Sequence, residues 1–189
     1  MVSLNFMFWM FVFLFGIIGA MRGWAKELLV AFSMILALTF LRLLETFVPF
    51  IKNMIPDEQF EVAGIVTNPV DSNVFWMRVI VVIVLVFFGY QTVALPRFAT
   101  KAAREKLQDM LLGFVFGAVN GYLIVGTLWF FMYQSAYPFA GYIMPPDPNT
   151  PMGQAAIDLV PYLAPRLLGE PTIYFAVVLA FIFVMVVFI

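Results

Sequence analysis

The sequence predicts an all-α, multi-pass transmembrane helical bundle with about five spans, formed by a single integral membrane domain over residues 1–189. Two observations predict this fold class. First, 64% of the residues are hydrophobic and only 11% are charged, whereas soluble domains are about half apolar and about a quarter charged. Second, the apolar residues gather into five segments near the length of about 20 residues that a helix needs to cross a bilayer. These predicted spans are residues 4–21, 28–44, 74–95, 110–133 and 172–189.

The first two spans are separated by a short charged turn. The first is uncharged and is followed directly by Arg22 and Gly23. The second has a shorter uncharged core, between Glu27 and Arg42, and continues only if the charged side chains pair or extend to the membrane surface. A short re-entrant or tilted helix is therefore the alternative to a full span for this segment.

The next three spans are bounded more clearly. The third carries one charge, Arg78, near its start and ends before Pro96, which cannot continue a helix. The polar loop that precedes it is expected to hold a short helix around residues 56–63. The fourth span follows Asp109, and the fifth is uncharged to the last residue of the sequence.

A proline-rich segment near residues 151–168 predicts an interfacial helix between the fourth and fifth spans. Thr150 followed by Pro151 is typical of an N-cap and a first helical position. Pro161 and Pro165 should bend this helix, because each removes a backbone donor and clashes with the preceding turn.

Basic residues predict which loops lie in the cytoplasm, because cytoplasmic loops are enriched in lysine and arginine. The loops at residues 22–27 and 97–109 share one side and hold six basic residues against three acids, while the other loops hold four against eight. The six are Arg22, Lys26, Arg97, Lys101, Arg104 and Lys106. We therefore expect a cytoplasmic C-terminus and an N-terminus outside.

A row of glycines marks one face of the fourth span. Gly113, Gly117 and Gly121 are each four residues apart, which places them on one side of a helix. Such a smooth face lets a second backbone approach closely inside a membrane. Packing against another helix of this chain is the first interpretation, and packing against a partner chain is the alternative. Asn120, beside the third glycine, is expected to make a hydrogen bond between helices.

The charged turn between the first two spans has two interpretations. Arg22 and Glu27 are expected to form a cytoplasmic anchor with a local ion pair. The alternative is that one of them caps another helix end or pairs with Asp109. Arg42 and Glu45, three residues apart, are expected to form an ion pair at the membrane surface.

Composition narrows the chemistry that this chain can perform. Cysteine and histidine are both absent, which removes thiolate nucleophiles, imidazole bases and the histidine ligands of haem or zinc. We therefore expect no catalytic residues, no metal site, no cofactor and no enzymatic activity. The net charge of −1 gives no indication of nucleic-acid binding, and the sequence shows no site for a soluble substrate.

Two blocks of residues together suggest a family. The first is Arg22-Gly23 with Glu27 four residues after the glycine, and the second is Asp109-x-x-Leu112-Gly113-x-x-x-Gly117-x-x-x-Gly121. This pairing resembles the colicin V production protein family of small bacterial inner-membrane proteins, over about residues 4–135. The resemblance implies a helical fold in the bacterial inner membrane and a link to colicin V production and envelope maintenance. It implies no agreed biochemical activity.

Two functions remain open at this point. The leading hypothesis is a non-catalytic accessory or assembly subunit that packs against other membrane-protein subunits of a larger inner-membrane complex, with an electron-transfer complex as one possible host. The glycine face and the near absence of soluble mass favour it. The alternative is a small-solute or peptide transport or export component of the colicin V production type. That function needs a polar path, for which Asn120, Gln91 and the Arg22–Glu27 turn are the candidates.

Overall fold

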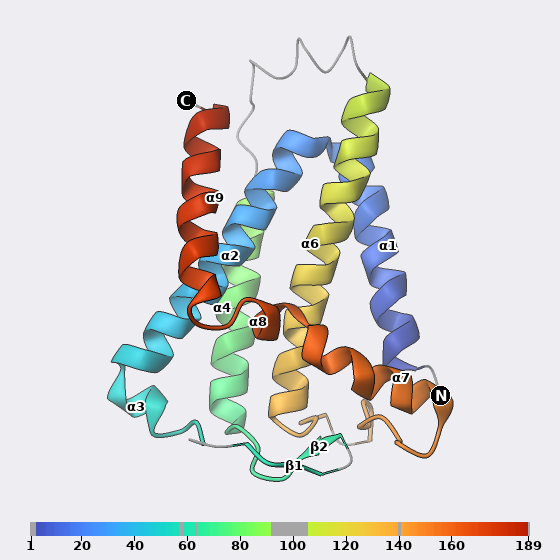
Figure 1. The fold of residues 1–189 in the computed structure, drawn as a ribbon, viewed down its shortest axis with the longest axis vertical. Helices are drawn as coiled ribbons and strands as arrows, with labels where there is room; N and C mark the ends of the chain where they lie inside the picture. Colours follow the sequence, from blue (N-terminus) through green and yellow to red (C-terminus); the bar gives the residue numbers. More distant parts are fainter. Residues whose placement is uncertain (1–2, 57–58, 63, 92–105, 140, 189) are drawn as a thin grey trace.

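Long helices dominate the computed structural model, which describes residues 3–56, 59–62, 64–91, 106–139 and 141–188. Four of them are long and apolar enough to cross a membrane: α1 (Leu4–Arg22), α2 (Trp24–Phe47), α4 (Ser72–Tyr90) and α6 (Lys106–Gln134). They stand side by side as a bundle (Figure 1). The predicted all-α, multi-pass transmembrane bundle is confirmed.

The second span is a full-length helix. α2 runs without a break for 24 residues, so the re-entrant alternative does not describe it. It continues past Arg42 and Glu45 because Glu45 faces Arg78 of α4, with 2.7 Å between its Oε1 and the arginine Nε. A charge that is paired inside the bundle does not have to end the helix.

Some predicted features extend beyond the described residues. α4 ends at Tyr90, and residues 92–95 of the predicted third span lie outside the described part. So do Arg97, Lys101 and Arg104 of the predicted basic loop. α6 is described from Lys106 onward and is therefore longer than the predicted span at residues 110–133.

A small hairpin replaces the short helix expected around residues 56–63, of which 57–58 and 63 are not described. After α3 (Pro49–Lys52), β1 (Glu61–Val62) pairs antiparallel with β2 (Ile65–Val66). Gly64 occupies the turn with a φ of 79°, a conformation that glycine adopts without strain. The branched side chains on both sides favour strands.

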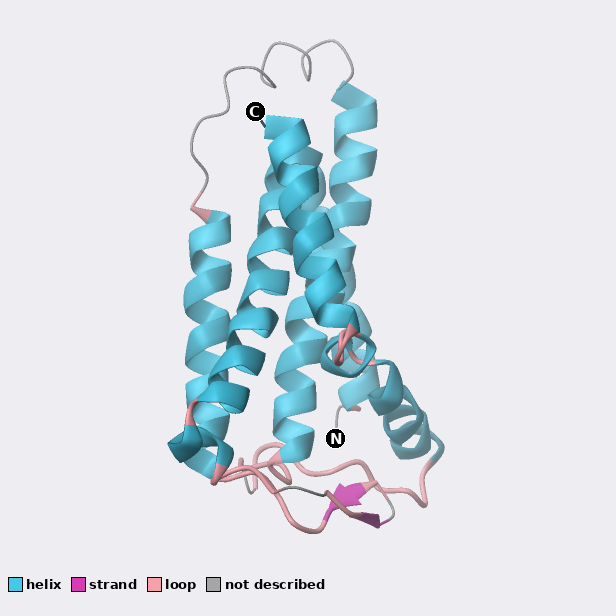
Figure 2. Ribbon diagram, turned by 60° about the vertical axis from the view of Figure 1, so that its left-hand side comes forward, coloured by secondary structure: helices cyan, strands magenta, loops and turns pink. Residues whose placement is uncertain are grey.

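The interfacial segment is bent where prolines interrupt it. It consists of α7 (Pro151–Leu159), a short 3₁₀ helix η1 (Val160–Tyr162) and α8 (Ala164–Leu167), followed by α9 (Thr172–Phe188). The hydroxyl of Thr150 accepts a hydrogen bond of 3.1 Å from the backbone nitrogen of Gly153, which makes it the N-cap. α7–α8 and α9 meet at 57° across a short break, and this bent pair is a fifth candidate span if it crosses the membrane as one unit. Figure 2 shows this bend at the lower end of α9, above the hairpin.

α2 and α6 form the centre of the bundle. α1 packs against α6, while α4 and α9 pack against α2. We call the end with the α1–α2 turn the Gly23 end, and the opposite end, with β1 and β2, the hairpin end (Figure 1). Between them lies a buried apolar layer, while large apolar side chains on the outer helix faces are exposed, as expected for contact with lipid. The layer includes Val30, Met34, Ala37, Val82 and Ile124.

Candidate functional site: two polar clusters at opposite ends of the bundle

The glycine face of α6 is filled by α1 of the same chain. Gly113, Gly117 and Gly121 are all buried, and a Cβ atom added to Gly117 would lie 2.8 Å from the Cα atom of Gly19. One added to Gly121 would lie 2.7 Å from the Cβ atom of Phe15. These distances are too short for any side chain, so the two backbones touch. Of the two interpretations drawn from the sequence, the structure therefore shows the first: the glycine face of α6 packs against another helix of the same chain.

The complementary surface on α1 was not recognised in the sequence. Gly16 and Gly19 are buried in α1, and a Cβ atom on Gly19 would lie 2.7 Å from the Cα atom of Gly117. With Gly23 they form a second row of glycines, spaced by three and four residues. Rows of small residues on two different spans are the sequence signal by which this interface could have been found.

Gly23 brings the charged turn together. It has a φ of 86°, a left-handed conformation that suits glycine, and it turns the chain from α1 into α2. Arg22, the last residue of α1, therefore reaches the first turn of α2, where its Nη1 lies 2.6 Å from the Oε1 of Glu27. The side chain of Glu27 is fully buried. A buried carboxylate needs such a partner, because burial without one is costly.

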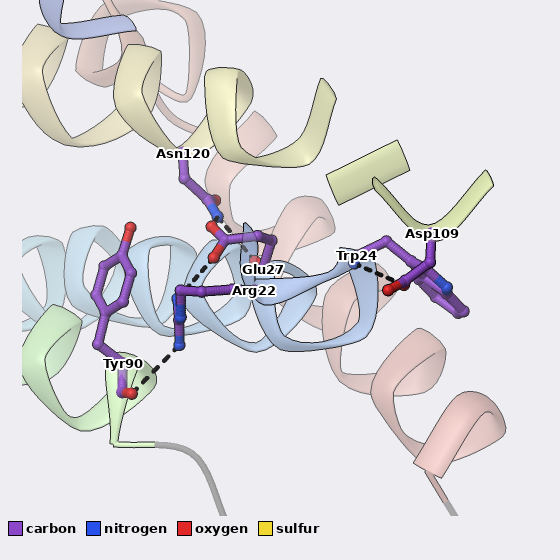
Figure 3. A network of polar contacts seen from close by, with 6 residues as sticks. All are labelled: Arg22, Trp24, Glu27, Tyr90, Asp109 and Asn120. Atoms are coloured by element: carbon purple, nitrogen blue, oxygen red, sulfur yellow. Dashed lines mark hydrogen bonds and ion pairs between the residues drawn. The ribbon is translucent and has the colours of Figure 1, made fainter. Parts of the chain in front are cut away.

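Asn120 completes the environment of the buried carboxylate. Its Nδ2 donates hydrogen bonds of 2.8 Å to the Oε2 of Glu27 and 2.8 Å to the backbone oxygen of the same residue. Figure 3 shows Asn120 on α6 pointing at Glu27 from the side opposite Arg22. The expected hydrogen bond between helices is present, and its partner is one of the charged residues of the first block.

Arg22 and Asp109 both act at the ends of helices. Arg22 Nη2 donates a hydrogen bond of 3.2 Å to the backbone oxygen of Tyr90, where the end of α4 leaves carbonyl groups unpaired. The Oδ1 atom of Asp109 accepts a hydrogen bond of 3.3 Å from the backbone nitrogen of Trp24 at the start of α2. Both positions match charge to helix dipole. The local ion pair between Arg22 and Glu27 and the capping of helix ends are thus both present. Within the described residues, Arg22 and Asp109 do not form an ion pair with each other.

A second cluster lies at the hairpin end and was missed in the sequence. Arg78 of α4 is only 4% exposed, and its Nε lies 2.7 Å from Glu45 Oε1. Its Nη1 donates a hydrogen bond of 2.9 Å to Gln134 Oε1, and Gln134 Nε2 donates one of 3.0 Å to Gln59 Oε1. The predicted surface pair is weaker, with 3.8 Å between Arg42 Nη1 and Glu45 Oε2. The lone charge inside the third span was the available signal.

A cavity of about 240 Å³ adjoins this second cluster. Its wall combines apolar side chains with charged ones from α2, β1 and α8. The hydroxyl of Tyr133 interacts with the carboxylate of Glu61 at its wall. The polar lining residues are Arg42, Gln59, Glu61, Tyr133, Gln134 and Arg166.

A row of polar residues on α6 connects the two ends. Asn120, Thr127 and Gln134 are seven residues apart, about two turns each, and so share one face of the helix. Thr127 is fully buried, and neither its hydroxyl nor the Oδ1 of Asn120 has a hydrogen-bond partner. Gln91, the other candidate for a polar path, is exposed after the last residue of α4 and does not join this row.

The hairpin end also holds a buried phenol. Tyr137, which follows α6, is 4% exposed, and burial raises the pKa of its hydroxyl to about 12. Trp129 Nε1 donates a hydrogen bond of 3.3 Å to that hydroxyl, which opposes the rise in pKa. Among the described residues, no group of three or more acidic side chains is arranged to hold a metal ion.

Comparison with known proteins identifies the family. The family model described as colicin V production protein matches residues 4–144, which covers α1 through α6. No curated protein and no solved structure matches the chain significantly. The resemblance carried by the Arg22–Glu27 and Asp109–Gly121 blocks is confirmed, and it indicates the bacterial inner membrane as the location of this membrane-spanning protein. The chain belongs to the colicin V production protein family.

Proposed function

We propose that this protein is a small-solute or peptide transport component of the colicin V production type. The observation that carries the proposal is the row of Asn120, Thr127 and Gln134, which runs along α6 between two buried ion-pair clusters. Fourteen residues of helix span about 21 Å, most of the roughly 30 Å thickness of a bilayer core. Ionisable groups inside a membrane are costly and commonly mark a pathway.

Buried atoms without hydrogen-bond partners strengthen this argument. The Oδ1 of Asn120 and the Oγ1 of Thr127 both lack partners, and an unsatisfied buried polar atom costs about 1–3 kcal/mol. The amide of Asn120 already bonds to Glu27 through its nitrogen, whereas packing alone gives no reason for a hydroxyl at Thr127. A solute or water that enters the row during transport supplies the missing hydrogen bonds.

The described conformation is closed between the two clusters. Val30, Met34 and Val82 are at most 1% exposed and separate the Gly23 end from the cavity at the hairpin end. The proposed transport therefore requires α2 and α4 to change their packing against α6. Their contacts involve side chains, whereas the glycine contact between α1 and α6 is backbone to backbone. We assign α1 and α6 to the fixed part of the protein.

Flux measurements in proteoliposomes test the proposal. Uptake of a panel of radiolabelled amino acids, dipeptides and sugars should exceed that of empty vesicles for at least one class. Asn120→Leu and Thr127→Val should abolish that uptake. Val119→Leu is the matched control, because Val119 is 45% exposed on the outer side of the same helix. Uptake equal to empty vesicles across the panel, or full uptake by Asn120→Leu, would overturn the proposal.

The orientation of the protein in the membrane is part of this proposal. We infer from the basic residues that the Gly23 end faces the cytoplasm and the hairpin end faces outward, with the N-terminus outside. The chain contains no cysteine, so single cysteines introduced at Lys26 and Lys52 can be labelled without background. A membrane-impermeant maleimide should react in intact cells at position 52 alone. Labelling at position 26 alone would reverse the assignment.

An accessory or assembly subunit is the second candidate function, and one observation favours it. Large apolar side chains outside the spans are exposed at the hairpin end, including Phe60 at 59% and Val62 at 63%. A membrane-protein subunit docked at the hairpin end would cover them. Neither candidate requires catalytic residues, and we propose that the protein is not an enzyme.

Co-purification separates this second candidate from transport. Purification in mild detergent from native membranes, followed by mass spectrometry, should recover another subunit in near-equal amount if the protein is an accessory subunit. Phe60→Ser combined with Val62→Ser should release that subunit, whereas Val119→Ser on the lipid-facing side of α6 should not. Recovery of this chain alone would exclude the accessory role.

A further inference from the structure

Among the residues that the structure describes, the lining of the cavity at the hairpin end carries more positive than negative charge. Arg42 of α2 and Arg166 of α8 line it together with Glu61 of β1. No hydrogen bond or ion pair is recorded for the guanidinium of Arg166 within the described chain, and Arg42 reaches Glu45 only at 3.8 Å. Two like charges facing one cavity repel each other, and an anionic group bound between them would remove that repulsion.

We propose that this cavity binds a small zwitterion, an amino acid or a dipeptide, with its carboxylate at Arg42 and Arg166 and its ammonium group at Glu61. This assignment deepens the proposed transport function by naming the substrate class. Guanidinium groups bind carboxylates through paired, charge-assisted hydrogen bonds. A ligand with only a negative charge would be repelled by Glu61. A ligand with only a positive charge would be repelled by the two arginines. A molecule with both charges satisfies all three residues.

The other walls of the cavity fit the same class of ligand. Its volume of about 240 Å³ lies below the roughly 300–1,000 Å³ typical of sites for drug-sized molecules, so the site suits a small solute. Val66, Phe130 and Pro165 supply apolar surface for a short side chain. Gln134, which lines the cavity and ends the polar row of α6, places the ligand at the entrance of the proposed path.

Equilibrium binding tests this assignment without requiring transport. The full chain in lipid nanodiscs is titrated calorimetrically with alanine and alanylalanine, and with N-acetylalanine and alanine amide as single-charge analogues. At least one of the two zwitterions should bind saturably, and both analogues should bind about tenfold more weakly or worse. Equal binding of N-acetylalanine would show a plain anion site, and no saturable binding of either zwitterion would show no such site. Either result overturns the proposal.

Variants locate the site and keep the test independent of folding. Arg166→Gln should weaken binding of the zwitterion about tenfold or more, while Lys52→Gln, an exposed cation on α3 outside the cavity, should leave it unchanged. Glu61→Gln should weaken the binding of the zwitterion but not the binding of N-acetylalanine. Thermal midpoints establish that each variant is folded, and unchanged binding in both Arg166→Gln and Glu61→Gln overturns the assignment.

The outcomes also separate this inference from the proposed function. Saturable zwitterion binding without uptake into proteoliposomes would exclude transport and leave the binding site standing. Uptake of a sugar without zwitterion binding would leave transport standing and exclude the site.

Discussion

The Gly23 end and the hairpin end each hold a buried ion pair, but they differ in what surrounds it. At the Gly23 end, Arg22 and Glu27 are enclosed by Asn120, the end of α4 and a backbone contact between α1 and α6. At the hairpin end, Arg78 and Glu45 lie next to a cavity through Gln134, which bonds to Arg78 and lines that cavity together with Arg166. The first cluster is closed upon itself and the second has room for a ligand.

This difference indicates separate roles for the two clusters. The closed cluster joins four helices at one place, so a change there should affect the stability of the whole bundle. The open cluster has charges that the fold does not use, so changes at its edge should affect binding before stability. The following predictions test this division, beginning with the largest expected effect.

Filling the glycine contact should disrupt the bundle most. In Gly117→Leu, the new Cβ atom would lie 2.8 Å from the Cα atom of Gly19, and backbone cannot move aside as a side-chain end can. We expect loss of the folded protein in detergent, measured by size-exclusion chromatography and thermal unfolding. Gly126→Leu is the control, since its Cβ atom would lie 3.5 Å from side-chain atoms of Phe8 and Leu163. Equal losses in both variants would contradict the assignment of the glycine face.

Removing the carboxylate of the buried ion pair should lower the free energy of unfolding more at the Gly23 end than at the hairpin end. Glu27→Ala leaves Arg22 and Asn120 without their partner and should destabilise the protein by about 3–5 kcal/mol. Glu45→Ala should cost less, because the side chain of Glu45 is 13% exposed and Arg78 retains Gln134 as an acceptor. Thermal midpoints in one detergent compare the two variants, and a greater loss in Glu45→Ala would reverse the comparison.

A double variant tests whether the closed cluster acts as a unit. Combining Arg22→Leu with Glu27→Ala should lower stability by less than the sum of the two single changes, because neither charge is then left buried without a partner. Strict additivity of the two losses would show that the two side chains act independently.

The buried phenol predicts a loss of stability at high pH, at the hairpin end. The pKa of Tyr137 is raised from about 10 in the unfolded chain to about 12 in the folded protein. The contribution of the neutral Tyr137 side chain to stability is therefore complete below pH 10. As the pH rises from about 10 to 12, the free energy of unfolding should fall by about 2–3 kcal/mol at most. Tyr137→Phe should remove this part of the pH dependence. A constant difference in thermal midpoint between the two proteins from pH 9 to 12 would refute it.

The smallest effect on stability is expected at the edge of the cavity. Arg166→Gln should change the free energy of unfolding by no more than about 0.5 kcal/mol, as is usual for an exposed side chain. Arg22→Gln at the closed end should be clearly destabilising under the same conditions. If the two variants lowered the thermal midpoint equally, Arg166 would be part of the fold and the cavity would not be an open site.

The sequence by itself determined the membrane class, the four long helices and the bent interfacial segment, because these depend on local properties. Hydropathy over about 20 residues defines a span, and Thr150, Pro161 and Pro165 act on their own turns of the chain. The family motif was also recognisable, since its residues lie at fixed spacings along the helices. Gly113, Gly117 and Gly121 could be placed on one face without knowing what covers it.

Only the tertiary structure decided what those residues touch. α1 covers the glycine face, Asn120 bonds to Glu27 across 93 positions of sequence, and Arg78 joins Glu45 and Gln134 from three different helices. No local pattern encodes these pairings, because they depend on which helices become neighbours and on how far each is rotated. The cavity at the hairpin end is the clearest case. Arg42, Glu61 and Arg166 come from separate elements, and their shared site exists only once the bundle, the hairpin and the bent segment have packed together.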